Sequence, residues 1–235
     1  MKDVGTLPEL GRVGRESLQQ RVHRELSRSL MHGAFSAGQV LRMQALADQL
    51  EVSIMPVREA MARLVSERAL EVLPSRSVRV PLIDEEMLED LRHARCVVEG
   101  ELVRQAAGNL TPSTLESLKQ LTTECEKAFV ELDTRHAIET SRLNYRFHFE
   151  IYQAAGSKVL LPIVQSLWLQ SGPYVREAAA IYKANPDLTA IHHHWAIVEA
   201  LEAKDGDRAA AALREDITES YNLIKCHSLT KKKGS

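Results

Sequence analysis

Three short runs of helical periodicity, followed by two short strand-like runs, limit what residues 17–80 can fold into. In each helical run apolar side chains recur every three or four positions. These side chains are Leu18, Val22, Leu26 and Leu30, then Leu46, Ala47 and Leu50, then Val57, Ala60, Met61, Leu64 and Val65. Residues 71–73 and 78–80 flank a turn, Pro74-Ser75-Arg76-Ser77, as a hairpin requires. This order of elements predicts a winged helix-turn-helix in residues 16–80.

Helix start and stop residues support these boundaries. Ser17 with Gln20 has the pattern of a capping box, in which each side chain binds a free backbone amide at the start of a helix. Gly33 ends the first helix. Ser53 is expected to cap the third helix, with Pro56 in its first turn, where a missing amide hydrogen costs little.

The rest of the chain shows only helical patterns. We expect about six or seven helices in residues 85–228, with one of them interrupted at Gly172-Pro173 and the last ending near residue 226. The fold class is therefore mainly α, a winged helix-turn-helix followed by an all-helical bundle. Residues 1–15 are expected to form a flexible arm, residues 81–84 a linker and residues 229–235 a tail.

Composition restricts the class of protein further. The 235 residues contain no apolar run long enough for a membrane span and no signal peptide, so no membrane partner is expected. Three well-separated cysteines fit a cytoplasmic protein better than a disulfide framework. Residues 17–80 carry nine arginines against six acidic residues, a net charge of +3, whereas residues 81–235 carry −5. Only the first part therefore suits a polyanion, although scattered surface arginines would give the same mild excess.

Basic and polar side chains of the predicted helix-turn-helix are placed to contact double-stranded DNA. Arg58, near the start of the third helix, is suited to bind guanine through two hydrogen bonds. An alternative for Arg58 is a surface salt bridge to Glu59 or Glu51. The full set of expected DNA contacts is Arg42, Ser53, Met55, Arg58, Arg63 and Arg76, with Arg42 and Ser53 on phosphates and Arg76 at the tip of the wing.

This segment resembles the GntR family of bacterial transcription regulators. The resemblance rests on Gly33, Gly38 and Leu41, on Leu46-Ala47-Asp48-Gln49-Leu50-Glu51-Val52-Ser53, and on Pro56-Val57-Arg58-Glu59-Ala60 with Leu64. Three positions depart from the family pattern: Ala37 replaces a proline, Ile54 a common arginine and Ser77 a wing glycine. The loss of the arginine implies a different operator preference.

In the second part, four polar residues stand on or beside apolar helix faces. Asn144 and His148 are four residues apart, and Asp216 lies on the apolar stripe of the last helix. His194 shares a helix face with Ile191, Val198 and Leu201. A buried carboxylate needs a partner, so these side chains could converge. Nitrogen and oxygen donors suit a divalent ion such as zinc, nickel or manganese. The simpler alternative is a hydrogen-bonded core histidine, or a surface run at residues 192–194.

Residues 85–227 also resemble the FCD domain, the all-helical ligand-binding domain of the FadR branch of GntR regulators. The matching segments are Arg95-x3-Glu99, Asn144-x3-His148, His194-x2-Ile197-x2-Ala200-Leu201 and residues 205–216. The resemblance implies a metal site at Asn144, His148, His194 and Asp216, in which Asn144 replaces an aspartate and Asp216 a histidine. It also implies a small organic acid as effector, with Arg95 as its carboxylate partner; the alternative for Arg95 is an ion pair with Glu99.

Three functions follow as hypotheses. The first is a homodimeric DNA-binding regulator, a repressor, whose operator affinity is controlled by a small carboxylate metabolite. The second is a DNA binder whose helical domain only forms dimers and senses nothing. The third, a metal-dependent enzyme, has no supporting catalytic motif, so we do not expect the protein to be an enzyme.

Overall fold

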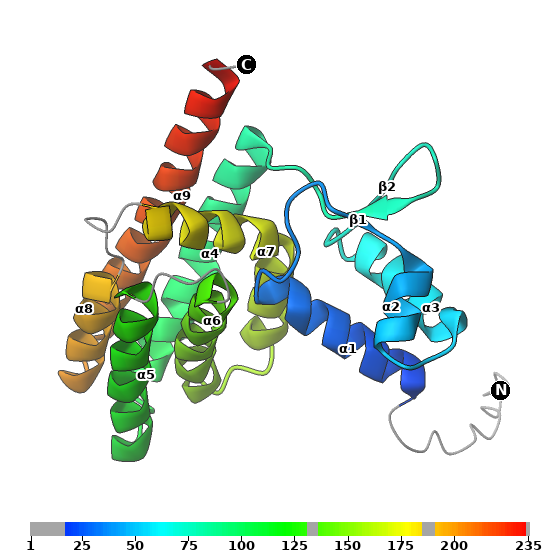
Figure 1. Cartoon of the computed structure of the whole chain (residues 1–235). Helices are drawn as coiled ribbons and strands as arrows, with labels where there is room; N and C mark the ends of the chain where they lie inside the picture. The colour runs from blue at the N-terminus through cyan, green and yellow to red at the C-terminus, as the bar shows by residue number, and fades with distance from the viewer. Residues whose placement is uncertain (1–16, 131–135, 185–190, 234–235) are drawn as a thin grey trace, which may run out of the picture.

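The chain forms two bodies (Figure 1), and each has its own hydrophobic core. The structure, a computed structural model, describes residues 17–130, 136–184 and 191–233. The N-terminal body is a winged helix-turn-helix and the C-terminal body is a bundle of helices, which confirms the predicted fold class. The predicted arm at residues 1–15 lies outside the described residues.

The N-terminal body contains three helices and a three-stranded antiparallel sheet. Its elements are α1 Leu18–Met31, β1 Val40–Leu41, α2 Met43–Gln49, α3 Ile54–Ser66, β2 Glu71–Val72 and β3 Val78–Arg79. The sheet order is β1-β3-β2, so β1, which the sequence did not predict, pairs with the second strand of the predicted hairpin. A two-residue strand is too short to show an alternating pattern.

The two predicted helix caps have different outcomes. The capping box is confirmed, because Ser17 Oγ accepts from the Gln20 amide at 3.3 Å and Gln20 Oε1 accepts from the Ser17 amide at 2.8 Å. Ser53 occupies the N-cap position of α3, but its side chain makes no capping hydrogen bond. The expected cap is therefore wrong in this detail, and the exposed Ser53 hydroxyl is left for another partner.

The C-terminal body consists of six helices in the described part of the chain, within the predicted number. They are α4 Glu85–Ala106, α5 Pro112–Val130, α6 His136–Ala154, α7 Leu160–Ala184, α8 Ile191–Glu202 and α9 Gly206–Lys233. Asp84 caps α4 by accepting from the Met87 amide at 2.9 Å. The last helix continues to Lys233, beyond the end that the sequence predicted, and none of the described helices could cross a bilayer.

Helix α7 differs from the prediction because it continues through Gly172 and Pro173. A proline removes one amide donor and usually ends or kinks a helix, and α7 bends part-way along its length (Figure 1). Packing against α1, α4, α6 and α9 holds both halves in place. Tertiary contacts therefore override the local break.

The same helix joins the two bodies. Leu169 of α7 belongs to the hydrophobic core of the N-terminal body. At Gly172 the backbone of α7 approaches α1 so closely that an added Cβ would lie 2.1 Å from the Leu30 carbonyl oxygen. One turn later Arg176 Nη1 donates to the carbonyl oxygens of Gly33 at 2.9 Å and Ala34 at 3.3 Å. The end of α1 is thus fixed to the middle of α7.

Candidate functional site

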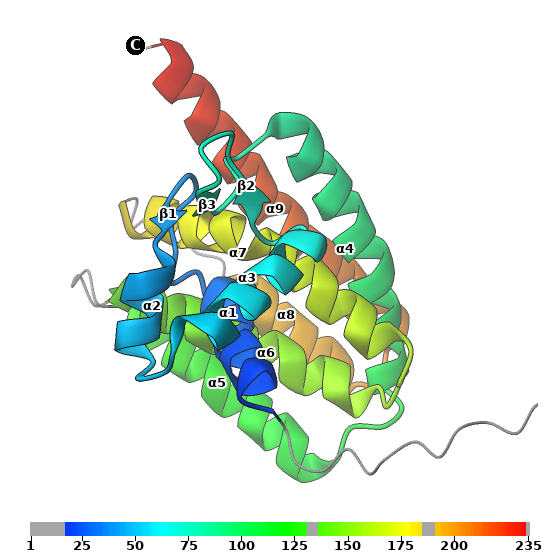
Figure 2. The same ribbon diagram turned by 90° about the vertical axis from the view of Figure 1, so that its right-hand side faces the viewer.

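The first candidate site is the outer face of the N-terminal body. Figure 2 shows α3 on the side that faces away from the helical bundle. Pro56, Val57 and Ala60 anchor the helix in the core, while Ser53, Met55 and Arg58 are exposed. Helix α3 therefore presents its N-terminal turns to solvent, the geometry in which a recognition helix enters the major groove.

The arginines on this face differ in what holds them. Arg42, Arg58 and Arg76 are exposed and form no ion pair within the described part of the chain, so the alternative salt bridge from Arg58 is not observed. Arg63 instead donates from Nε to Glu67 at 2.8 Å. Glu67 also contacts His23 of α1 at 2.8 Å. The unpaired arginines are available for phosphates or bases, whereas Arg63 links α3 to α1.

The second candidate site is a buried cluster in the helical bundle. It unites His148 of α6, His194 of α8 and Asp216 of α9, whose donor atoms all lie within 4.8 Å of one another. Both histidines are 1% exposed and Asp216 is 6% exposed. Asn144, one turn before His148, reaches the cluster through Oδ1, which lies 3.1 Å from His194 Nε2. The structure thus brings together all four residues proposed as metal ligands.

Burial and charge determine the protonation of this cluster. Burial lowers the pKa of His194 to about 3, so its imidazole is neutral near pH 7. Burial alone would raise the pKa of Asp216, but the hydrogen bond and charge of His148 and the other histidines outweigh it and lower that pKa. A neutral imidazole and an ionised carboxylate are the forms that bind a divalent ion.

The hydrogen bonds of His148 fit metal ligation as well. The Tyr152 hydroxyl donates to Glu99, so at its 3.4 Å contact with His148 Nδ1 the ring nitrogen is the donor. Nε2 lies 3.4 Å from Asp216 Oδ2. His194 Nε2 faces the Asn144 oxygen, and His194 Nδ1 is buried without a hydrogen-bond partner, so its lone pair is open to an ion. The donors present therefore fit a divalent metal ion.

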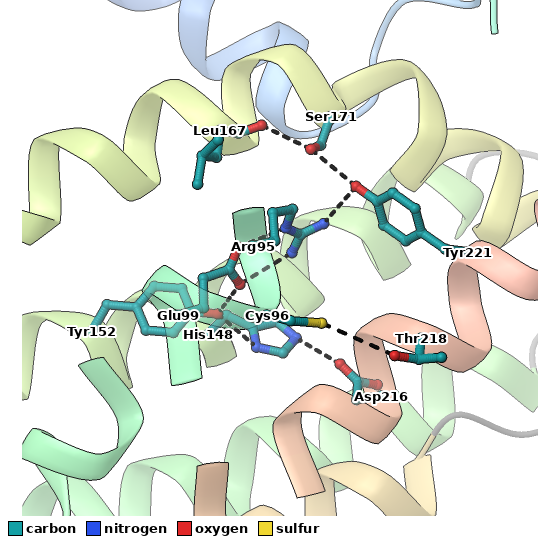
Figure 3. A network of polar contacts seen from close by, with 10 residues as sticks. All are labelled: Arg95, Cys96, Glu99, His148, Tyr152, Leu167, Ser171, Asp216, Thr218 and Tyr221. Carbon is teal, nitrogen blue, oxygen red and sulfur yellow. Dashed lines mark hydrogen bonds and ion pairs between the residues drawn. The ribbon is translucent and has the colours of Figure 1, made fainter. Parts of the chain in front are cut away.

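Arg95 lies above this cluster in a buried network, drawn in Figure 3. Its Nε and Nη2 donate to the two carboxylate oxygens of Glu99 at 2.6 and 3.2 Å. The ion pair that the sequence left open as an alternative is therefore present. Burial alone would lower the pKa of the Arg95 guanidinium. The negative charge of Glu99 and its hydrogen bonds to Arg95 have the larger effect and raise that pKa. Nη1 remains for the Tyr221 hydroxyl at 3.4 Å.

A cavity of about 60 Å³ opens beside the cluster. Arg95, Asn144, His148 and Asp216 line one side of it. The remaining walls come from α6, α7 and α9, as Thr140, Ser141, Tyr174, Val175, Ala178, Ala179, Tyr182, Ile217, Ser220, Tyr221 and Ile224. Sequence analysis missed these α7 and α9 residues, although positions 174, 178 and 182, and 216, 220 and 224, each share one helix face.

Comparisons with known proteins agree with this architecture. The family model "Bacterial regulatory proteins, gntR family" matches residues 18–80, and the FCD domain model matches residues 90–219. The chain belongs to the GntR family. Its second body is an FCD domain, so the resemblance drawn from the sequence is confirmed.

Relatives of this GntR-family chain span nearly its whole length. The HTH-type transcriptional regulator McbR of Escherichia coli K12 is 31% identical over 223 residues, covering 93% of this chain and 97% of McbR. The repressor GlaR of the same organism is 28% identical, with 88% and 91% covered. The solved structure of E. coli McbR superposes with a TM-score of 0.81 at 29% identity, covering 91% of this chain and all of that one. The protein is a DNA-binding transcription regulator and not an enzyme.

Proposed function

We propose that this GntR-family regulator is a homodimeric repressor whose operator affinity is set by a small organic acid in the FCD cavity. Residues 16–80 would bind DNA, and residues 85–228 would bind the effector and form the dimer. Residues 81–84 would link these two parts. Repression is supported by the relatives GlaR and RspR, which are named repressors. Because its target is the chromosome, it would act in the cytoplasm.

The single observation that carries this proposal is the position of the cavity. One side of it shares Asn144, His148 and Asp216 with the candidate metal cluster, and α7 forms another wall. The same α7 is fixed to α1 through Gly172 and Arg176. A ligand in the cavity would therefore contact the helix that positions the DNA-binding body.

The residues divide the work as follows. Asn144, His148, His194 and Asp216 would hold a zinc, nickel or manganese ion, which as a Lewis acid would bind the effector carboxylate. Arg95 would orient Tyr221 rather than bind the effector directly, because Nε and Nη2 of its guanidinium already donate to Glu99. On the DNA, Arg58 would bind a guanine, with Met55 beside it, while Arg42, Ser53, Arg63 and Arg76 would lie along the backbone.

Elemental analysis and native mass spectrometry of the purified full chain would test the metal and the dimer. We expect about one divalent ion per chain, lost in a His148→Ala, His194→Ala double variant and retained in His93→Ala, whose histidine is exposed on α4. Retention of the ion in the double variant would contradict the assigned ligands.

Titration onto genomic DNA fragments would test the regulator. We expect one fragment to bind far more tightly than random duplex, with log affinity falling linearly with log salt. Adding metal and an organic acid should change that affinity. Binding that is no tighter than to random duplex would contradict the proposal.

A DNA binder that senses nothing is the second candidate. It requires the cavity to be filled by side chains, and the observed cavity favours a sensing domain instead. Thermal-shift screening with metals and carboxylic acids separates the two, since only a ligand of the folded state raises the melting temperature.

A further inference from the structure

The charges that line the FCD cavity are few. Among its described lining residues, Arg95 is the only lysine or arginine and Asp216 the only acid. The other polar groups are hydroxyls, the Asn144 amide and the His148 ring. The number of carboxylates that this wall can accept is therefore set by Arg95, by Asp216 and by an ion at the cluster.

The charge of Arg95 is already neutralised by Glu99. Nε and Nη2 of Arg95 donate to Glu99, and its Cζ lies 4.4 Å from the centroid of the Trp168 ring. Nη1 donates to the Tyr221 hydroxyl. Glu99 is 0% exposed and also accepts from Tyr152, so pulling Arg95 away would leave a buried carboxylate without its countercharge.

Apart from the Arg95–Glu99 pair, the charges at the cluster would be balanced by one anionic group of a ligand. Among the four proposed ligands Asp216 is the only acid, while Asn144, His148 and His194 offer amide or imidazole donors, which bind a metal in their neutral form. A divalent ion held by this set leaves one positive charge, which one ligand carboxylate neutralises. A second carboxylate on the ligand would be buried with no cation to pair it, which is costly.

Part of the cavity lining is apolar. Val175, Ala178 and Ala179 come from α7, and Ile217 and Ile224 come from α9. The rings of Tyr174 and Tyr221, 6.2 Å apart and nearly parallel, also belong to the lining. The two alanines leave room for the apolar body of a ligand.

We propose that the cavity selects monocarboxylic acids with an apolar body, and discriminates against dicarboxylic acids. The inference rests on the proposed function, since it names the effector class of the same site. The carboxylate binds at the metal cluster and the apolar body extends between α7 and α9.

A matched six-carbon series tests the proposal by isothermal titration calorimetry on the zinc-loaded full chain. The probes are hexanoate, hexanamide without the charge, and adipate with a second carboxylate. Hexanoate should bind at least about tenfold more tightly than each of the other two. Adipate binding as tightly as hexanoate would overturn the inference, and so would the absence of binding by either acid.

A charge introduced into the apolar wall gives a second test. Val175 is half-buried, so a Val175→Lys chain can bring its ammonium to the cavity edge. The ratio of adipate to hexanoate affinity should rise at least about tenfold, while Val159→Lys, at a position 73% exposed and outside the cavity lining, should leave it unchanged. An unchanged ratio in a folded Val175→Lys protein would contradict the inference. If this variant does not fold, the ligand series on the unmodified chain is the deciding test.

The outcome also separates this inference from the proposed function. If hexanoate binds as expected but leaves operator affinity unchanged, the ligand class stands and the regulatory proposal is wrong. If adipate binds best and changes operator affinity, the regulator stands and the ligand class is wrong.

Discussion

Arginines of the DNA-binding body share a charge but not an environment. Arg58 is exposed and unpaired on the first turns of α3, whereas Arg63, five residues later, is bound to Glu67. Arg58→Ala should therefore weaken binding to the specific operator by about 1–3 kcal/mol. Arg63→Ala should have a smaller effect, because its guanidinium would have to leave Glu67 to reach DNA. Fluorescence anisotropy with operator and random duplex would measure both; equal losses for the two variants would contradict the assignment.

His32, at the end of α1, should make stability depend on pH. Burial, together with the charges of Arg28 and Arg142, lowers its pKa below 6.5, and its Nε2 is buried without a partner. Between the folded pKa and 6.5 the unfolded state binds more protons, so stability falls as the pH drops through 6.5. His32→Phe keeps the edge contact with the Tyr145 ring, 4.7 Å away, and cannot titrate. Melting temperatures from pH 7.5 to 5.5 should fall less steeply in this variant; identical slopes would contradict the prediction.

Among the elements, the wing carries one strained position. Arg76 has φ 63° in the turn between β2 and β3, closed by bonds from the Leu73 amide to Ser77 and from the Arg76 amide to Leu73, both 2.8 Å. Glycine adopts this conformation without a steric penalty, so Arg76→Gly should stabilise the N-terminal body by about 1 kcal/mol while weakening DNA binding. Ser75→Gly, at a residue without positive φ, should not stabilise. Chemical denaturation and operator titration would check both; tighter DNA binding by Arg76→Gly would exclude a role for its charge.

Local patterns predicted α1, α2 and α3 because each combines a periodic apolar face with its own start or stop residues. They failed where distant contacts decide the outcome. Gly172-Pro173 has the local properties of a break, but four neighbouring helices hold α7 together through it. Strand β1 exists only because β3 pairs with it, and the sequence of two residues does not encode that pairing.

The candidate metal cluster was predictable because a polar residue on an apolar stripe needs a buried partner. His148 and Asp216 stood out for that reason, and the structure places them in contact. Spacing could not decide whether Arg95 pairs with Glu99 or with a ligand, because the sequence Arg95-x3-Glu99 is compatible with both alternatives. It depends on the distances among α4, α6 and α9, which bring Tyr152 and Tyr221 to the same pair.

On the scale of the whole molecule, α1 and α7 hold the two bodies together, and their backbones come very close at Gly172. A Cβ on Gly172 would lie 2.1 Å from the Leu30 oxygen and 2.8 Å from its carbonyl carbon, both backbone atoms that cannot rotate away. Gly172→Ala should therefore destabilise the protein by about 1–3 kcal/mol and loosen α1 from α7. Gly108→Ala, whose Cβ would have 3.9 Å to its nearest neighbour, is the control. Thermal denaturation and limited proteolysis would report the change; equal stability of the two variants would contradict this contact.

The cavity and this contact are joined by one short path. Tyr221 lines the cavity, and its hydroxyl lies 3.1 Å from Ser171 Oγ, on the residue next to Gly172. If ligand occupancy reaches the DNA-binding body through α7, Ser171→Ala should leave ligand binding nearly intact but weaken its effect on operator affinity. Removing one hydrogen bond of about 1 kcal/mol should reduce that effect about fivefold.

Ser166→Ala is a matched control for this path, since Ser166 lies on the same helix with its side chain exposed. Operator affinity would be measured for each variant with and without zinc and hexanoate, alongside calorimetry of hexanoate binding. A Ser171→Ala chain that binds hexanoate and shifts its operator affinity as fully as Ser166→Ala would show that the signal leaves the cavity by another route. Helix α7 contributes a cavity wall, a core residue of the N-terminal body and the Gly172 contact. We therefore expect Ser171→Ala to weaken the effect of the ligand on operator affinity, and Ser166→Ala, on the exposed side of the helix, to leave it unchanged.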